Sequence, residues 1–239
     1  MDTEYYKNLI LSMLENNTYY EKLTYNNPQK TLKNLSSLFQ IHGMGLTTHE
    51  IDYLSNFKYS PSLFYRLPNI HKNPLICEAC KVSTSLCINV PPPTNLKLRP
   101  IIAGPSCETH HLSNFLDILL KPLLKYVKSY IRDDLDMLNH LLKTVKDRTL
   151  LVSFNMVNLY TNIPHDYGIE AITFWLEKYP EEIPGRINQN FVIEVLKFVL
   201  LNNHFLFDTT YYRQKCGIAM GTRAAPVIAN LVMGYHELK

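Results

Sequence analysis

Apolar residues recur at helical spacing over much of the chain, which predicts a helix-rich protein with few strands. The clearest helix runs from Leu112 to Val127, where apolar residues repeat every three or four positions and Pro122 predicts a kink. Asn27 and Pro28 are typical of a cap and a first turn, so a helix is expected to follow them. Further helices are predicted after Thr47 and Glu50, from Asp133 to Val145, from Pro164 to Trp175, over 191–201 and over 224–237.

Short apolar stretches bounded by turn residues predict the strands. "SLFYRLP" ends at Pro68, "LKLRPIIAGP" follows it, and "HFLFDTTYYRQ" reads as a hairpin that turns at 208–210. Residues 149–154 predict one more strand, buried in the middle of a sheet, whereas residues 73–98 are expected to be irregular. The chain is therefore predicted to have an α+β fold, helix-rich with a small antiparallel sheet.

Length and composition restrict the class of protein without identifying a function. The chain has 239 residues, of which 46% are hydrophobic, enough for one large domain or two small ones. Its net charge of +3 is too small to produce a strong electrostatic field that would attract nucleic acid or membranes. No apolar run is long enough to cross a membrane, and the N-terminal "MDTEYYKN" does not resemble a signal peptide. We expect a soluble intracellular protein, with nucleus and cytoplasm not distinguished.

The cysteines leave two interpretations open. Cys77 and Cys80 have the spacing of zinc ligands, with Cys87, Cys107 and three histidines in neighbouring segments. A second tight pair of ligands at a suitable distance is missing. This favours reduced thiols in a loop over a zinc site.

Five segments carry a more specific signal than the fold class. They read "LFYRLPNIHK", "LRPIIAGPSCETHHLSNFLDILLKPLL", "SYIRDDLDML", "LVSFNMVNLYTNIPH" and "QKCGIAMGTRAAPVIANLVM". In order and spacing they closely resemble the reverse transcriptase of Penelope-like retroelements, from about Tyr5 to Glu237. The resemblance implies an RNA-directed DNA polymerase of a retrotransposon, a nucleotidyltransferase, with part of a right-hand polymerase fold. It divides the chain into an N-terminal helical region (1–60), a fingers-like region (61–148) and a partial palm (149–239).

The resemblance assigns nucleotide-binding roles to three residues. Arg99 matches a fingers arginine that holds the triphosphate of the incoming nucleotide, and Lys72 assists it. Tyr160 matches the aromatic residue that floors the sugar site and rejects a 2′-hydroxyl. Solvated surface charges and ordinary core packing remain the alternatives for these side chains. The loop that approaches the template base and the nascent pair matches Gln214, Gly217, Ala219, Met220 and Gly221.

Asn155 occupies the position of the family's first catalytic aspartate. Polymerase chemistry uses carboxylates to hold two Mg²⁺ (or Mn²⁺) ions, and an asparagine lacks the charge that this requires. The family's adjacent aspartates follow the Gly-rich loop and its helix, so we expect this chain, which ends at Lys239, to lack them together with any thumb and GIY-YIG-type endonuclease. The N-terminal lead-in is likewise expected to be missing, which makes the chain truncated at both ends.

Four other aspartates are interpreted as structural. Asp133 and Asp134 are adjacent, but they precede Asn155 and lie where a helix needs its cap. Asp166 and Asp208 are predicted to be a helix cap and a turn residue.

Three hypotheses follow from these observations. The first is a reverse transcriptase-like domain with a degenerate active site, whose partners are an RNA template, a DNA primer and deoxynucleoside triphosphates. The second is a remnant that binds nucleic acid without extending it. The third is a decayed reading frame without a function, in which sheet edges and apolar faces stay open.

Overall fold

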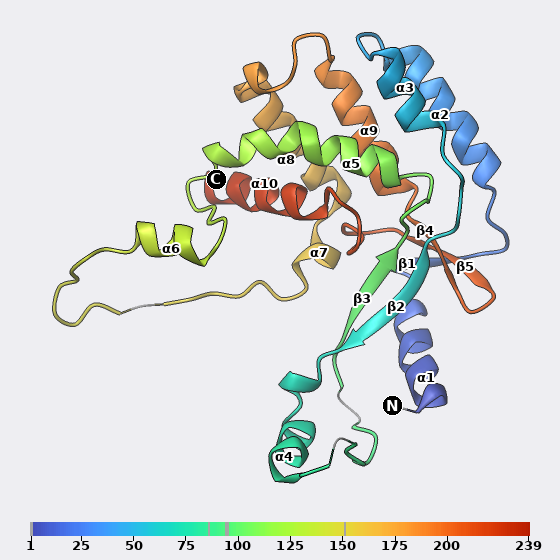
Figure 1. Ribbon diagram of the computed structural model, residues 1–239. Helices are drawn as coiled ribbons and strands as arrows, with labels where there is room; N and C mark the ends of the chain where they lie inside the picture. The colour runs from blue at the N-terminus through green and yellow to red at the C-terminus, as the bar shows by residue number, and fades with distance from the viewer. Residues whose placement is uncertain (1, 86, 94–95, 151) are drawn as a thin grey trace.

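A helical body and a five-stranded sheet make up the computed structural model (Figure 1), which describes residues 2–85, 87–93, 96–150 and 152–239. The α-helices are α1 (Thr3–Leu14), α2 (Pro28–His42), α3 (Thr48–Ser55), α4 (Pro74–Val82), α5 (His110–Leu120), α6 (Asp134–His140), α7 (Leu159–Asn162), α8 (His165–Lys178), α9 (Gln189–Leu201) and α10 (Ala225–Glu237). The strands are β1 (Tyr20–Leu23), β2 (Leu63–Pro68), β3 (Leu98–Ala103), β4 (His204–Phe207) and β5 (Thr210–Gln214). Short 3₁₀ helices are η1 (Ile70–Lys72), η2 (Lys121–Tyr126) and η3 (Pro180–Glu182). Among the described residues, no helix has the length and apolar character needed to cross a membrane.

The main core lies where α5, α8, α9 and α10 pack together. Trp175 of α8 is 1% exposed, and its indole Nε1 donates to the carbonyl oxygen of Leu231 at 2.8 Å. The helix predicted over 112–127 is an α-helix only as far as Leu120, and it gives way to the 3₁₀ helix η2 at Lys121, directly before Pro122. The apolar spacing therefore predicted the helices of the core well, since each buries the face that the spacing defines.

The sheet has the strand order β1-β5-β4-β2-β3. Three of its pairs are antiparallel, but β2 and β4 run parallel, with Leu63 opposite Leu206. The prediction of an antiparallel sheet is thus wrong, and the sheet is mixed. The physical reason is the long connection between β2 and β4, which passes through β3 and the helical body and lets β4 enter the sheet parallel to β2.

One face of the sheet is covered by α1, and the other face of β2 is open. Ile10 of α1 packs on Phe64 of β2 in the second apolar cluster. Arg66 also points to this covered side, where its guanidinium donates to the carbonyl oxygen of Leu9 at 2.8 Å. Because side chains alternate along a strand, Tyr65 lies on the opposite face, where it is 41% exposed.

Strand β1 and helix α4 are among the elements that were not predicted. Strand β1 lies in a region expected to be helical, and α4 lies in the segment expected to be irregular. A strand as short as β1 is recognised only by its partner β5, which is far away in sequence. The signal for α4 was present, since Asn73 before Pro74 repeats the cap of α2, and the Asn73 side chain accepts from the Ile76 backbone N–H at 3.2 Å.

Residues 149–154 do not form the predicted buried strand. Leu150 and Phe154 are 85% and 93% exposed, and no strand of the described chain lies beside them; Leu151 is outside the described residues. A strand needs a neighbour for its backbone groups and a core for its side chains. Apolar composition alone indicated the strand, and neither condition is met here.

The predicted helix after Asp133 forms only in part. Asp133 is its cap, as expected, and its carboxylate accepts from the backbone N–H of Asp136 at 2.9 Å. The helix ends at His140, and Leu135 and Leu138 are 72% and 61% exposed. The apolar stripe that predicted a longer helix therefore has nothing in the described chain to pack against.

The two remaining aspartates have different outcomes. Asp208 is the predicted turn residue, with φ of 53° between β4 and β5. The cap interpretation is wrong for Asp166, because α8 starts at His165 and its N-cap position is Pro164. Asp166 lies inside the first turn, where a negative charge still interacts favourably with the helix dipole.

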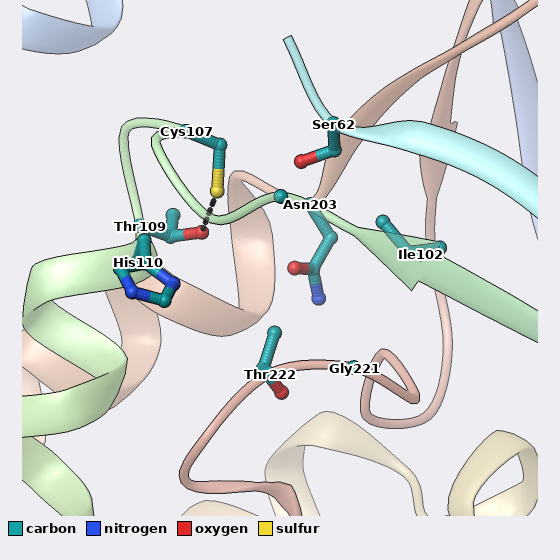
Figure 2. Close-up of a pocket in the computed structure, with 9 residues that line it drawn as sticks. Ser62, Ile102, Cys107, Thr109, His110, Asn203, Gly221 and Thr222 are labelled. Carbon is teal, nitrogen blue, oxygen red and sulfur yellow. Dashed lines mark hydrogen bonds between the residues drawn. The ribbon is translucent and has the colours of Figure 1, made fainter. Parts of the chain in front are cut away.

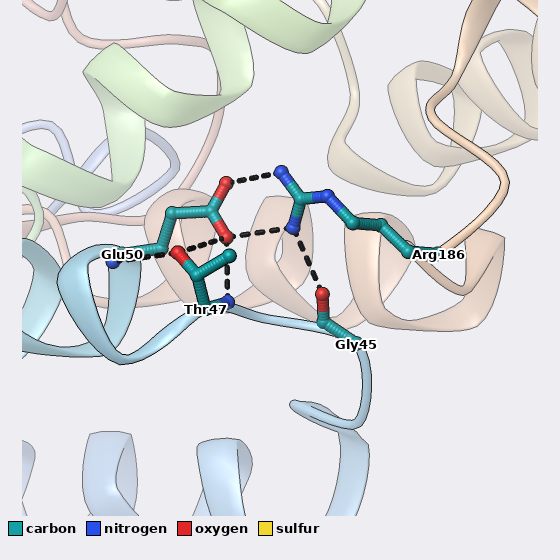
Figure 3. A network of polar contacts seen from close by, with 4 residues as sticks. All are labelled: Gly45, Thr47, Glu50 and Arg186. Carbon is teal, nitrogen blue, oxygen red and sulfur yellow. Dashed lines mark hydrogen bonds and ion pairs between the residues drawn. The ribbon is translucent and has the colours of Figure 1, made fainter.

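A polar network joins the start of α3 to the segment before α9 (Figure 3). The predicted capping box is present, since Thr47 N–H donates to Glu50 Oε2 at 2.7 Å and Glu50 N–H donates to Thr47 Oγ1 at 3.2 Å. Arg186 donates to both carboxylate oxygens of Glu50, at 2.7 and 2.6 Å, and to the carbonyl oxygen of Gly45 at 2.8 Å. The hydrogen bonds from Arg186 hold the pKa of the Glu50 carboxyl at about 2.

Replacing Glu50 by glutamine is expected to lower the free energy of unfolding by about 1 kcal/mol at pH 7, the value of a well-oriented surface pair. The folded-state pKa is lower than the ordinary value of 4.5, so this stabilisation is complete above about pH 4.5 and is lost as the pH falls toward 2. Urea unfolding of both proteins at neutral and acidic pH measures the difference. An equal difference at both pH values would contradict the assignment.

Candidate nucleic-acid interface

The segment between β5 and α10 is a loop fixed at both of its ends, which we call the docked loop (residues 214–222). Ile218 N–H donates to the carbonyl oxygen of Tyr160 at 2.6 Å, and Gly217 N–H donates to that of Ile163 at 3.1 Å. These bonds attach the first half of the loop to α7 and to the start of α8.

The second half of the docked loop lies against β3. Ile102 N–H donates to the carbonyl oxygen of Met220 at 2.8 Å. An edge strand would otherwise present this N–H to solvent, so the loop covers the edge of the sheet at that point. The docked loop thereby joins α7 and α8 to β3, which lie far apart in sequence.

Two glycines make the close approach possible. Gly217 has φ of +77° and Gly221 has φ of +117°, in the left-handed region that glycine adopts without strain. A Cβ on Gly217 would overlap the carbonyl oxygen of Tyr160, and one on Gly221 would overlap that of Ile102. Glycine is therefore required on both sides of the docked loop.

A small cavity separates the end of the docked loop from β3 (Figure 2). Its volume is about 10 Å³, room for a single water molecule. Asn203 is 4% exposed with no partner for its Nδ2 among the described residues, and Figure 2 draws its amide toward Thr222. The cavity is too small for a nucleotide, so a larger ligand must bind outside it.

The uncovered side of β2 and β3 offers such a surface, which we call the open face (Leu63, Tyr65, Leu67, Arg99 and Ile101). Directly opposite residues share a face, and the register pairs Leu67 with Arg99 and Tyr65 with Ile101. Leu63, Tyr65 and Leu67 are 56%, 41% and 48% exposed. The open face therefore combines an aromatic ring, aliphatic side chains and one guanidinium next to the docked loop.

Both predicted phosphate-binding residues lie at the outer end of this strand pair. Arg99 is near the start of β3, and Lys72 is in η1, directly after β2. Pro68 and Leu98 are paired there, so the two cations lie at the same end of the strands. Both side chains are exposed. Ile102, where the loop docks, is three residues along β3 from Arg99, or about 10 Å.

The other predicted residues are less exposed than the resemblance implies. Gln214 is 3% exposed and its Nε2 donates to the carbonyl oxygen of Cys216 at 2.8 Å. Ala219 is fully buried in the cluster beneath α1. Tyr160 is half-buried against the main core, and Met220 is half-buried beside β3. These side chains fix the docked loop, in which Lys215 and Gly221 are exposed.

The described side chains do not fit the metal ions that the resemblance implies. Asn155 lies in an exposed segment without regular structure, and no group of three His, Cys, Asp or Glu residues in the described chain is placed to hold a metal ion. Mg²⁺ prefers anionic oxygens in octahedral geometry, and Asn155 offers one neutral oxygen.

The cysteines are free thiols in the structure. Cys77 and Cys80 lie on α4, and Cys107 is buried near β3. The Cys77 thiol contacts the carbonyl oxygen of His71 at 3.3 Å. Cys77 and Cys80 therefore lie on a helix and not in the expected loop.

Sequence reasoning missed two residues of this region. His165 Nε2 lies 2.9 Å from the carbonyl oxygen of Gly217 and so helps to hold the docked loop. Tyr65 is the aromatic residue of the open face, and the alternation in "LFYRLP" was the signal for its orientation. Comparison with known proteins found no matching family model, no matching curated protein and no matching solved structure.

Proposed function

We propose that this chain is a reverse transcriptase-like domain that binds a primer–template duplex and lacks the carboxylates needed to extend it. The docked loop carries this proposal. It brings "GIAMG", the strand of "LRPIIAG" and the helix of "LYTNIPH" together through backbone hydrogen bonds. The resemblance implies that these three segments lie side by side. The backbone hydrogen bonds between them support the proposal independently of the sequence similarity.

The open face is the surface that we assign to the nucleic acid. Arg99 presents a planar fork of donors to phosphate oxygens, and Lys72 adds a point charge at the same end. Tyr65 offers a ring on which an unpaired base stacks, a contact that tolerates every base. Phosphate contacts hold the strand, and stacking on Tyr65 orients the base next to the docked loop.

Binding of a labelled RNA–DNA primer–template is expected to weaken steeply with salt, because each neutralised phosphate releases counterions. Arg99→Ala is expected to weaken binding and to reduce the slope of log K against log salt concentration by about one. Fluorescence anisotropy between low and physiological salt measures both quantities.

Arg132→Ala is the matched control, since Arg132 is exposed at the start of α6 and is paired with Asp133. It should leave the slope unchanged. Undetectable binding of the unaltered chain, or equal effects of the two substitutions, would contradict the proposal.

A further inference from the structure

A second concave surface lies toward the β1 edge of the sheet, between the N-terminal half of α2, the segment before it and the turn into β4. We call it the asparagine cleft, and it is lined by Leu23, Thr24, Tyr25, Asn26, Asn27, Lys30, Thr31, Asn34, Asn202 and His204. Its volume is about 390 Å³, within the range of pockets that hold small ligands. The asparagine cleft is separate from the docked loop, which lies against β3.

The lining selects a class of ligand. No carboxylate lines the asparagine cleft, and Lys30 supplies a cation that has no ion-pair partner in the described chain. Leu23 is the one aliphatic side chain among the lining residues, which disfavours an apolar ligand. A cationic ligand would be repelled, so the chemistry fits an anion that carries polar groups.

The asparagine side chains present both donors and acceptors. Asn27 Oδ1 accepts from the Lys30 backbone N–H at 3.0 Å, and Asn202 Nδ2 donates to the carbonyl oxygen of Phe198 at 2.8 Å. Each bond fixes its amide and leaves the other amide atom without a partner among the described residues. His204 adds a buried Nδ1 that also has no partner there. A ligand with a mixed donor and acceptor edge satisfies these groups, and the buried Nδ1 of His204 is the one that is costly to leave unpaired.

We propose that the asparagine cleft binds one unpaired nucleotide. Its phosphate lies against Lys30 at the N-terminus of α2, where the helix dipole adds to the charge. The amide groups of Asn34 and Asn202 contact the edge of the base, and Tyr25, 70% exposed at the rim, stacks on its face.

Continuity with the open face supports the assignment. Leu63 pairs with Leu206, and His204 lies two residues from Leu206 on the same face of β4. Leu206 is opposite Tyr211 of β5, and Tyr211 is opposite Leu23 of β1. The asparagine cleft and the open face therefore lie on one side of the sheet. A single strand that follows this side reaches both. The proposal nevertheless stands without the primer–template function, because a mononucleotide tests it alone.

The test is a titration of the isotopically labelled full chain with adenosine 5′-monophosphate, ribose 5-phosphate and inorganic phosphate, followed by side-chain amide signals in NMR spectra. The mononucleotide is expected to shift the Asn34 and Asn202 amide signals, and the other two probes are expected to bind at least about tenfold more weakly. Lys30→Ala should weaken mononucleotide binding about tenfold.

Lys33→Ala is the control, because Lys33 is exposed on the same helix and does not line the cleft. Three results would each overturn the proposal: no shift of these amides at about 10 mM mononucleotide, equal binding of ribose 5-phosphate, or equal weakening by Lys33→Ala. A circular dichroism spectrum of each variant confirms that it is folded. Loss of primer–template binding with mononucleotide binding intact would leave this proposal standing.

Discussion

Purified protein supplied with an RNA template, an annealed DNA primer, deoxynucleoside triphosphates and Mg²⁺ or Mn²⁺ is expected to give no template-dependent extension. Asn155 stands where the resemblance implies an aspartate, and it lies in an exposed segment without regular structure. A loss of about 4 kcal/mol in transition-state stabilisation already lowers a rate roughly a thousandfold. The neutral amide of Asn155 and the lack of a cluster of metal ligands in the described chain together should lower the rate of extension below detection.

Asn155→Asp alone is expected to leave extension undetectable. A single added carboxylate cannot hold two cations close together, and the described chain offers no cluster of ligands to complete the site. The products are resolved on a denaturing gel beside those of an active reverse transcriptase. Extension to the end of the template by either protein would contradict the account.

Replacement of Gly217 by alanine is expected to destabilise the protein by about 3 kcal/mol, combining a left-handed backbone with a steric overlap. The added Cβ would overlap the carbonyl oxygen of Tyr160 and the Cα of Thr161, and both are backbone atoms that cannot rotate away. The docked loop would have to leave α7, with loss of the hydrogen bond from Ile218. Urea unfolding measures the change in stability, and primer–template binding should weaken in the same variant.

Gly185→Ala is the matched control. A Cβ at Gly185 meets no atom within 4 Å, and its φ is not positive, so alanine there is expected to be neutral or slightly stabilising. If the two alanine variants unfold at the same urea concentration, the docked loop is not fixed as described.

The helical body could be predicted because its signals are local. Apolar spacing defined α5, α8, α9 and α10, and the caps of α2 and α3 were visible as Asn27 with Pro28 and as Thr47 with Glu50. The hairpin of β4 and β5 was likewise encoded in its turn, where Asp208 has a positive φ.

The errors occurred where structure depends on distant partners. The four residues of β1 become a strand only beside β5, and the parallel pairing of β2 with β4 depends on the path of the whole helical body. Residues 149–154 show the converse, since strongly apolar residues stay exposed where the described chain provides no neighbouring strand.

Burial in the structure bears on which of the predicted site residues a ligand could contact, whereas their roles stay predictions. Arg99 and Lys72 are exposed at one end of the β2–β3 pair, as a phosphate-binding role requires. Gln214 and Ala219 match the loop that is expected to approach the template, and their side chains are buried because the docked loop turns them toward the interior. Sequence motifs indicate which residues lie close together, whereas burial decides which of their atoms a ligand can contact.

Hydrogen–deuterium exchange of the chain with and without an RNA–DNA primer–template shows most directly whether the open face and the docked loop bind the duplex. We expect the duplex to slow exchange in β2, β3 and the docked loop, and to leave exchange in residues 152–157 and α6 unchanged. Unchanged exchange in β2, β3 and the docked loop under conditions that saturate binding would contradict the account.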